Sequence, residues 1–278
     1  MNLWIIYNRA RHHVNRWFAD RLRTALRERG SHAEIIIADT PGELPAGEFP
    51  EIALNRSADP EIALYLEKHG CRVWNDSYTA RICNDKWQTH LLLQETGIPI
   101  LPTFLATETT LDTLPDIPGV LKSRDGHGGT EVYLVNDPAR RKEAFGKIGK
   151  PTAVFQRAAT DLGKDLRVYV LGKTIVAAMF RRSETDFRSN FCLGGRAERC
   201  DPIPPEVRDQ VGRIVELFHF GLVGIDFIFD RGKPIFNEIE DVVGTRMLYA
   251  HTDIDIAGIY ADFVLRQGKP DEISVDRS

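Results

Sequence analysis

The sequence has few of the residues that staple small or secreted proteins. Its 278 residues include only four cysteines, and no two of them form a Cys-x-x-Cys pair. Disulfide frameworks and structural zinc sites need cysteines in larger number or in paired spacing. A chain of this length can bury a sufficient core without such links. We therefore expect a reduced, cytoplasmic protein.

Long hydrophobic runs are also missing. The longest stretch without a charged residue extends from Thr96 to Thr107 and contains two prolines, so it is too short to cross a bilayer. The first thirteen residues have no basic segment ahead of their apolar run and no small-residue cleavage site. We expect no signal peptide and no membrane partner.

An excess of positive charge is absent as well. The formal net charge is −4 and the isoelectric point is about 6.1, which disfavours the dense positive surface of a non-specific nucleic-acid binder. We therefore expect no nucleic-acid partner. Apolar residues make up 42% of the chain and charged residues 27%, as in ordinary globular proteins.

The first hundred residues favour strands that alternate with helices. Apolar residues recur at three- and four-residue spacing from Val14 through Trp17 to Leu26, which predicts one helix with a buried stripe. Short apolar runs on either side of it predict strands, so we expect a parallel sheet covered by helices. Arg56 follows one predicted strand end, where such sheets bind ligands; it is a candidate binding residue or an ordinary turn residue.

The pattern changes after residue 84. A helix is predicted to begin at Asn84 or Asp85, to bury Trp87, Leu91 and Leu92, and to end at Gly97. Beyond it, strand-like segments joined by short glycine turns predict antiparallel pairing, for example over 121–135, 166–180 and 223–239.

Three carboxylates fall on one predicted hairpin. Glu238 and Glu240 point the same way because side chains alternate along a strand. A three-residue loop with a left-handed Gly232 would place Asp226 opposite Glu238. Carboxylates that share one face repel each other, and oxygen ligands without nearby histidine or cysteine suit Mg²⁺ or Mn²⁺. The alternative is a set of surface acids or salt-bridge partners for three arginines: Arg181, Arg188 and Arg246.

A glycine-rich turn lies upstream of that hairpin. Lys122 precedes the sequence Ser-Arg-Asp-Gly-His-Gly-Gly, where backbone N–H groups could approach a phosphate. The turn leads into a strand and lacks a Gly-Lys-Ser/Thr ending, so it is not a P-loop. Lys86, at the start of a predicted helix, could add a second phosphate contact. The alternatives are a plain turn and a solvated lysine.

Together these residues resemble the ATP-grasp superfamily, RimK-like branch, over about residues 50–265. The order and spacing of the motifs carry the resemblance. They are Lys122 to Gly129, Gly163-Lys-Asp165-Leu-Arg167, Ala177 to Arg182, Asp186-Phe-Arg188-Ser-Asn190, Gly194-Gly195, Gly224-Ile-Asp226, Asn237-Glu238-Ile-Glu240 and Asp253 to Gly258.

The resemblance implies a mixed α/β and α+β fold, with two α+β subdomains that clasp ATP. We expect a pre-ATP-grasp α/β domain over 1–83, a small ATP-grasp subdomain over 84–155 and a large subdomain with the metal site over 156–278. It also implies an ATP-dependent ligase that joins a carboxylate to an amine through an acyl phosphate. The expected cofactors are ATP and Mg²⁺ or Mn²⁺.

The resemblance also implies roles for single residues. The residues implied to bind the nucleotide are Lys86, Lys122, Gly126, Gly128, Gly129, the hinge Gln156, Arg157 and Ala158, and Asp165 at the sugar. Those implied to act at the reacting centre are Arg181, Arg188 and Asn190. Those implied to hold metal are Asp226, Glu238 and Glu240. Candidates for binding substrate are Arg56, Arg167 and Arg246.

Two positions depart from the family pattern. Arg157 replaces the acidic residue that usually follows the hinge glutamine. Glu240 replaces the usual asparagine, and the loop from Asp241 to Arg246 replaces a small-residue–Pro–Gly loop. Arg246 could bind a substrate carboxylate or pair with Asp241 or Glu240.

We therefore predict a ligase whose substrates are small-molecule or peptide carboxylates and amines, with an amino acid added to an amino acid, peptide or small metabolite. The alternatives are a phosphotransferase and a nucleotide-binding regulatory protein on the same fold. A homo-oligomer is compatible with the sequence.

Overall fold

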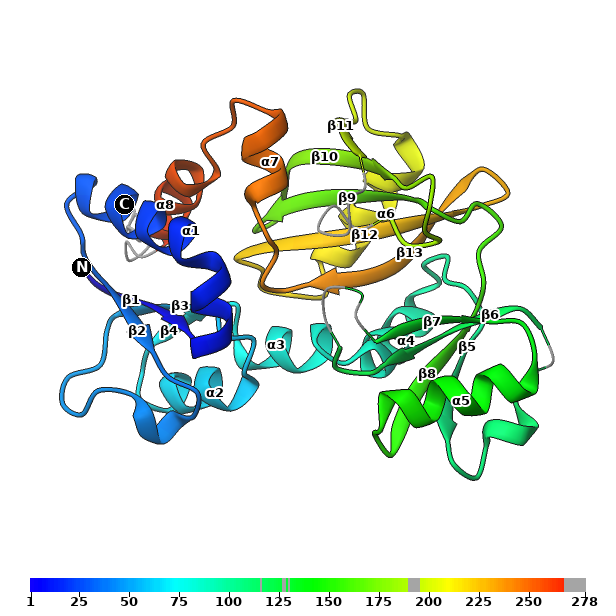
Figure 1. Ribbon diagram of the computed structural model, residues 1–278. Helices are drawn as coiled ribbons and strands as arrows, with labels where there is room; N and C mark the ends of the chain where they lie inside the picture. The colour runs from blue at the N-terminus through cyan, green and yellow to red at the C-terminus, as the bar shows by residue number, and fades with distance from the viewer. Residues whose placement is uncertain (116, 127–128, 130, 190–195, 268–278) are drawn as a thin grey trace, which may run out of the picture. The chain divides into compact units, whose positions relative to one another are not determined.

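The computed structural model describes residues 1–115, 117–126, 129, 131–189 and 196–267 (Figure 1). Two residues of the predicted site, Gly128 and Asn190, lie outside these ranges. By its internal contacts the chain forms two compact units, one of residues 1–77 together with the segment that begins at Ile254, and one of Tyr78–Asp253. The boundaries predicted at 83/84 and 155/156 stay predictions.

The first unit is built on a parallel sheet, as its sequence pattern predicts. The strand order is β2-β1-β3-β4 and every pair is parallel. Its strands are β1 (Asn2–Tyr7), β2 (His32–Ile37), β3 (Ile52–Asn55) and β4 (Arg72–Trp74). Its helices are α1 (Arg9–Glu28), the 3₁₀ turn η1 (Pro41–Glu43), α2 (Pro60–Lys68) and α8 (Ile256–Gln267).

Helix α1 is present where the apolar spacing predicts a helix, but its buried face is different. Asn8 caps it by accepting a hydrogen bond from the backbone N–H of Arg11, and Gly30 follows it with a φ of 83°. The buried positions begin at Phe18. Val14 and Trp17 are instead 55% and 52% exposed, so the predicted stripe is wrong in the first half of the helix.

Helix α8 contacts α1 and completes this unit. Arg21 lies 3.1 Å from Asp255, and Arg29 lies 2.6 Å from Asp262. The last described helix therefore packs on the N-terminal sheet unit, although more than 170 residues separate the two segments in the chain.

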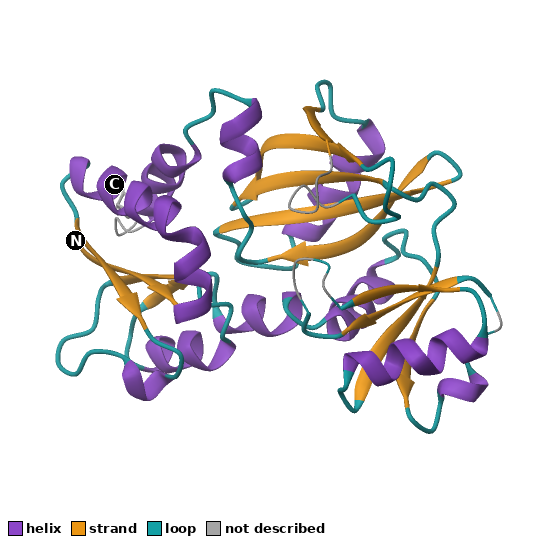
Figure 2. Cartoon of the chain, in the orientation of Figure 1, coloured by secondary structure: helices purple, strands orange, loops and turns teal. Residues whose placement is uncertain are grey.

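The second unit contains two antiparallel sheets (Figure 2). The smaller has the order β5-β8-β6-β7 and the larger has the order β11-β10-β9-β12-β13. The smaller is made of β5 (Thr103–Thr107), β6 (Gly119–Ser123), β7 (Val132–Val135) and β8 (Thr152–Arg157). The larger is made of β9 (Lys164–Leu171), β10 (Thr174–Arg182), β11 (Arg196–Arg199), β12 (Leu222–Asp230) and β13 (Lys233–Glu240).

Helices cover one face of each sheet in this unit. Helix α5 packs against β6 and β7, and α6 packs against β13. The helical elements are α3 (Ser77–Cys83), α4 (Lys86–Thr96), the 3₁₀ turn η2 (Leu111–Thr113), α5 (Pro138–Ile148), α6 (Pro205–Val215) and α7 (Arg246–His251). Among the described residues, no helix combines the length and apolar character that a membrane span requires.

Helix α4 has the predicted ends but not the predicted stripe. Asp85 accepts hydrogen bonds from the backbone N–H groups of Trp87 and Gln88, and Gly97 ends the helix in the left-handed region. The buried positions are Thr89, His90 and Leu93, whereas Leu91 is exposed.

The β12–β13 hairpin brings Asp226 opposite Glu238, as predicted, but by a different route. Its turn has two residues, Arg231 and Gly232, with φ values of 53° and 75°, so the predicted three-residue loop is wrong. A bulge on β13 restores the register, because Phe227 pairs with Phe236 while Asp226 pairs with Glu238. The residue left over on β13 is Asn237.

Candidate active site

An open cleft with about 990 Å³ of empty space lies between the two sheets of the second unit. Ten of the residues predicted for the site line it. On the smaller sheet, α4 and their connections these are Lys86, Lys122, Gly126, Gly129, Gln156 and Arg157. On the larger sheet and its loops they are Asp165, Arg188, Glu238 and Glu240.

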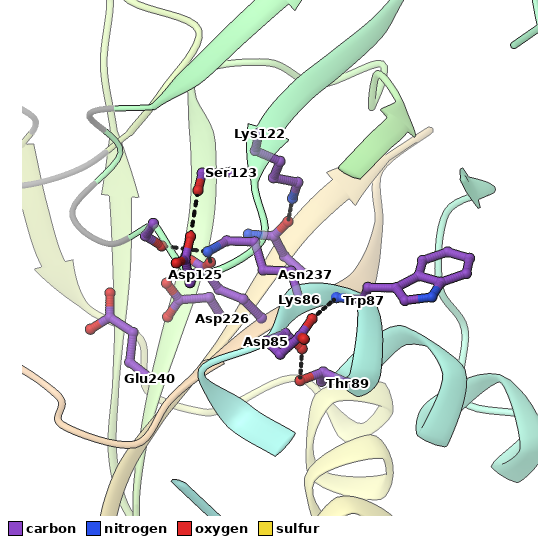
Figure 3. Close-up of polar contacts among 12 residues, drawn as sticks. Asp85, Lys86, Trp87, Thr89, Lys122, Ser123, Asp125, Asp226, Asn237 and Glu240 are labelled. Carbon is purple, nitrogen blue, oxygen red and sulfur yellow. Dashed lines mark hydrogen bonds and ion pairs between the residues drawn. The ribbon is translucent and has the colours of Figure 1, made fainter. Parts of the chain in front are cut away.

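Two lysines lie side by side in the cleft (Figure 3). Lys122 on β6 is only 7% exposed and donates a hydrogen bond to the side-chain oxygen of the bulged Asn237, at 3.1 Å. Burial, with a contribution from Lys86, lowers the pKa of Lys122 to about 8 despite the opposing effect of Glu238. Lys86, the first residue of α4, lies 3.7 Å from Glu238 and donates to the backbone oxygen of Gly126.

The glycine-rich turn is anchored at both ends. Lys150, just after α5, contacts Asp125 at 2.6 Å and Glu131 at 3.2 Å, and it also donates to the Ser123 hydroxyl at 3.0 Å. Burial opposes ionisation of Asp125, yet the hydrogen bonds from Lys150 and Ser123 lower its pKa to about 2. Lys150 carries no motif signal, so the sequence did not identify it.

The three predicted metal ligands converge. Asp226, Glu238 and Glu240 each offer a carboxylate oxygen, and these oxygens all lie within 4.8 Å of one another. Glu238 and Glu240 line the cleft, while Asp226 is 1% exposed and lies behind them. The hairpin register thus gathers on one face the carboxylates that the sequence spacing predicted.

Two buried arginines hold these carboxylates. Arg167 on β9 contacts Asp226 at 2.7 Å and Glu240 at 2.6 Å. Arg181 on β10 contacts Asp226 at 2.8 Å and Asp165 at 2.5 Å. The result is one continuous chain of alternating charges, in the order Asp165, Arg181, Asp226, Arg167, Glu240.

The arginines also set the ionisation of this chain. Burial works against the charged form of Asp226, but Arg167 and Arg181 outweigh it and lower the Asp226 pKa to about 2. At the two ends burial prevails, so the pKa values of Asp165 and Glu240 are raised. Arg181 is only 3% exposed and Arg167 only 7%. Both guanidinium groups are therefore buried, and both pair with carboxylates of the same sheet.

Arg188 lies at the glycine-rich turn. It donates to the backbone oxygen of Gly129 at 2.6 Å, and its other donors bind Asp186. The guanidinium therefore reaches the turn from the larger sheet's side of the cleft.

The predicted hinge, Gln156 to Ala158, stays a prediction, and only part of it lines the cleft. The backbone N–H groups of Arg157 and Ala158 already donate to the oxygens of Pro102 and Pro118, both at 2.9 Å. Ala158 is not among the lining residues described, and Ala159 lines the cleft instead. The sequence did not indicate Ala159 as a cleft-lining residue, because an alanine after a strand has no chemical signal.

The remaining two substrate candidates lie outside this cleft lining. Arg56 belongs to the first unit, where it is 1% exposed, lies 3.4 Å from the Tyr7 hydroxyl and stacks over Phe18. Arg246 begins α7 and is exposed. Glu240 pairs with Arg167, and within the described ranges Arg246 forms no ion pair with it.

The donor set of the carboxylate cluster fits a hard divalent cation. It contains only oxygen, and the Mg²⁺ and Mn²⁺ ions prefer such ligands. A carboxylate has about four lone-pair directions, so an oxygen that accepts from an arginine can still face an ion. Glu238 and Glu240 present their carboxylates to the cleft.

Comparisons with known proteins agree with this geometry. A family model described as the RimK-like ATP-grasp domain matches residues 83–264. A probable alpha-L-glutamate ligase from Maridesulfovibrio salexigens is 29% identical over 231 residues, which cover 76% of each chain. N-acetylaspartylglutamate synthase A from Homo sapiens is 29% identical over 237 residues, which cover 78% of this chain and 60% of that protein.

A solved structure with the same fold is D-alanine–D-alanine ligase from Bacillus anthracis, complexed with ATP. It aligns with a TM-score of 0.76 over 96% of this chain and 97% of that one, at 15% identity. The matches favour neither a phosphotransferase nor a regulatory protein. Because the family model spans well over half of the sequence, the chain belongs to the RimK-like ATP-grasp family and is an ATP-dependent carboxylate–amine ligase.

Proposed function

We propose that this ligase adds an amino acid, with glutamate as the first candidate, to the carboxylate of an amino acid, a peptide or a small metabolite. The observation that carries the proposal is the cleft itself, where two lysines face clustered carboxylates. Support for glutamate comes from the two relatives described above, whose names include glutamate ligation and N-acetylaspartylglutamate synthesis.

In this proposal the nucleotide lies between the two sheets. Lys86 and Lys122 bind its phosphates, since both ammonium groups lie at the cleft wall. The glycine-rich turn covers the phosphates, and Arg188 supports the turn from the other side. The backbone near Ala159 holds the base, while Asp165 faces the sugar. Anchoring of the turn by Lys150 keeps its backbone N–H groups near the phosphates.

The carboxylate cluster holds the metal in this proposal. Glu238 and Glu240, which line the cleft, would hold Mg²⁺ or Mn²⁺ together with the buried Asp226. A bound divalent ion would neutralise the charge that develops during phosphoryl transfer. Arg167 and Arg181 are positioning residues, because they pair with the carboxylates and neither is among the described residues that line the cleft.

The chemistry follows from the weakness of a carboxylate as an electrophile. An oxygen of the substrate carboxylate attacks the terminal phosphorus, the bond to ADP breaks, and an acyl phosphate forms. The amine then attacks the acyl carbon, inorganic phosphate leaves, and the amine gives up a proton as the amide forms. The two lysines stabilise the transferring phosphoryl group in the first step. Arg246, exposed beyond Glu240, is the candidate for binding a substrate carboxylate.

Product analysis tests the proposal. The chain is incubated with ATP, Mg²⁺, glutamate and a panel of acids and peptides, and mass spectrometry follows the gain of one amino acid less one water. We expect ADP, free phosphate and the amide to form in equal amounts. In Asp226→Asn and in Lys122→Ala we expect none of the three products. Unimpaired turnover in either variant would remove the basis for those assignments. Phosphorylated product without amide would contradict ligation.

A further inference from the structure

The connection between the two sheets is fastened to the β12–β13 turn. Residues 157–163 lead from β8 in the smaller sheet to β9 in the larger one. Five of them line the cleft: Arg157, Ala159, Asp161, Leu162 and Gly163. This connection contacts the turn at Arg231 and Gly232, which joins β12 to β13, the hairpin that carries the three carboxylates. The same contacts therefore hold both walls of the nucleotide site.

The central contact is an ion pair between Arg157 and Asp230. Two guanidinium nitrogens of Arg157 donate to the two carboxylate oxygens of Asp230, at 2.8 and 3.2 Å. Asp230 also accepts from the backbone N–H of Thr160, at 3.0 Å. The hydrogen bonds from Arg157 lower the pKa of Asp230, so the carboxylate is charged at neutral pH. The side chains are 29% and 13% exposed, which makes the pair only partly screened by water.

Backbone contacts strengthen the same junction. The N–H of Arg231 donates to the Thr160 hydroxyl at 2.6 Å, and the N–H of Gly232 donates to Asp161 at 2.8 Å. Asp161 in turn donates its own N–H to the oxygen of Phe229, at 3.2 Å. The positive φ values of the two turn residues give these N–H groups their direction.

The ion pair with Asp230 also limits which hydrogen-bond donors of Arg157 are available to a base in the cleft. A guanidinium with unused donors binds the 6-oxo group and N7 of guanine in a bidentate manner. Here one terminal nitrogen of Arg157 donates to Asp230 and to the backbone oxygen of Ala158, and the other donates to Asp230. These bonds use three of the five N–H groups of the guanidinium and hold it against Asp230 in the junction.

We propose that Asp230 is a positioning and specificity-determining residue that holds Arg157 away from the base and so keeps the site selective for adenine over guanine nucleotides. The inference rests on the proposed placement of the base at this hinge. Asp230 does not line the cleft among the described residues, and it acts through Arg157. Loss of the carboxylate would loosen the junction and free donors that suit a 6-oxo purine.

The test compares ADP and GDP binding by calorimetry, with the full-length chain and Mg²⁺. In Asp230→Asn we expect ADP affinity to fall about tenfold, the equivalent of about 1.4 kcal/mol, and GDP affinity to rise relative to ADP. In the double variant Asp230→Asn with Arg157→Met, ADP affinity stays low but the gain for GDP disappears. The control Glu216→Gln, which breaks the exposed pair with Lys173, leaves both affinities unchanged.

Each result has one meaning. Thermal unfolding first confirms that the variants fold. A wild-type chain that fails to bind ADP contradicts the proposed function as a whole. Normal wild-type binding with unchanged nucleotide selectivity in Asp230→Asn overturns only the role of Asp230. An equal gain for GDP in the double variant also overturns it, because no guanidinium would then be available to select the 6-oxo group.

Discussion

Arg167 contacts both Asp226 and Glu240, so one buried guanidinium neutralises two of the three carboxylates in the cluster. This explains how the chain tolerates glutamate where its family usually has asparagine. The added negative charge lies 2.6 Å from a cation that is almost fully buried. An unpaired charge in such a place is costly, while a paired one is tolerated.

The first prediction concerns this pair. Arg167→Met leaves Asp226 and Glu240 without their shared partner, and we expect the free energy of unfolding to fall by about 3–5 kcal/mol. Glu240→Gln keeps the shape of the side chain and leaves Arg167 paired with Asp226, so we expect this variant to lose less free energy of unfolding. Combined with Glu240→Gln, Arg167→Met destabilises less than the sum of the two changes. Urea denaturation of the four proteins measures this coupling; strict additivity would contradict a direct interaction.

The second prediction is a pH dependence of nucleotide binding. Lys122 has a lowered pKa of about 8 in the nucleotide-free protein, so it loses its proton as the pH rises through that value. A bound phosphate favours the charged form and raises the pKa. ADP affinity should therefore decline above pH 8, by up to about tenfold per pH unit. Calorimetry at several pH values measures the decline.

Lys122→Arg is the matched control, because arginine stays charged across this range, and its profile should be flat above pH 8. The lowered pKa of Lys122 also makes the stability of the nucleotide-free protein depend on pH, in the opposite direction to the affinity for ADP. Between pH 8 and the ordinary lysine value near 10.5 the unfolded chain binds more protons, so the free energy of unfolding gains with pH. A wild-type affinity that is constant from pH 7 to 10 would contradict the role of Lys122.

The third prediction concerns the anchor of the glycine-rich turn. Lys150→Met removes the contacts with Asp125, Glu131 and Ser123, and the two acids then repel each other. We expect a KM for ATP that is about tenfold higher, with a smaller change in kcat, because the turn must be ordered again on binding. Steady-state kinetics measure both constants. Lys147→Met, on α5, is the matched control; it breaks an exposed pair with Glu143 and should change neither constant.

The sequence predicts the parallel and antiparallel sheets well because their signals are local. Alternation along β12 and β13 put Glu238 and Glu240 on one face, and the pairing with Asp226 is confirmed. The prediction of the turn failed because the sequence does not show a bulge. The two-residue turn and the extra Asn237 compensate each other, so the register was right for the wrong reason.

Contacts that join distant segments were not predictable. Lys150, just after α5, contacts Asp125 of the glycine-rich turn. Arg157 on β8 of the smaller sheet pairs with Asp230 on β12 of the larger sheet. Nothing in the spacing of either pair marks it. The prediction that Val14 and Trp17 are buried was wrong for a related reason. Apolar periodicity predicts an apolar face on a helix, but it does not show how much of that face a neighbouring element covers.

The last prediction concerns the packing behind the cluster. Gly224 lies two residues before Asp226, and a Cβ atom at this position would meet a methyl carbon of Val243 at 2.6 Å. Gly224→Ala should therefore lower the free energy of unfolding by about 1–3 kcal/mol, as overpacking of a dense core does. Val243→Ala removes the obstructing methyl groups, so combining the two changes should recover part of that loss relative to Val243→Ala alone.

The control for this steric effect is Gly212→Ala, on α6, where the added Cβ meets no atom within 4 Å apart from the helix's own nearby backbone and the neighbouring residues. Alanine there should stabilise the helix by about 0.5–1 kcal/mol. If Gly224→Ala is as well tolerated as Gly212→Ala, the loop that carries Val243 is not packed against β12. The Glu240 carboxylate would then lack the rigid support that keeps it beside Arg167, because residues 241–243 follow it directly in the chain.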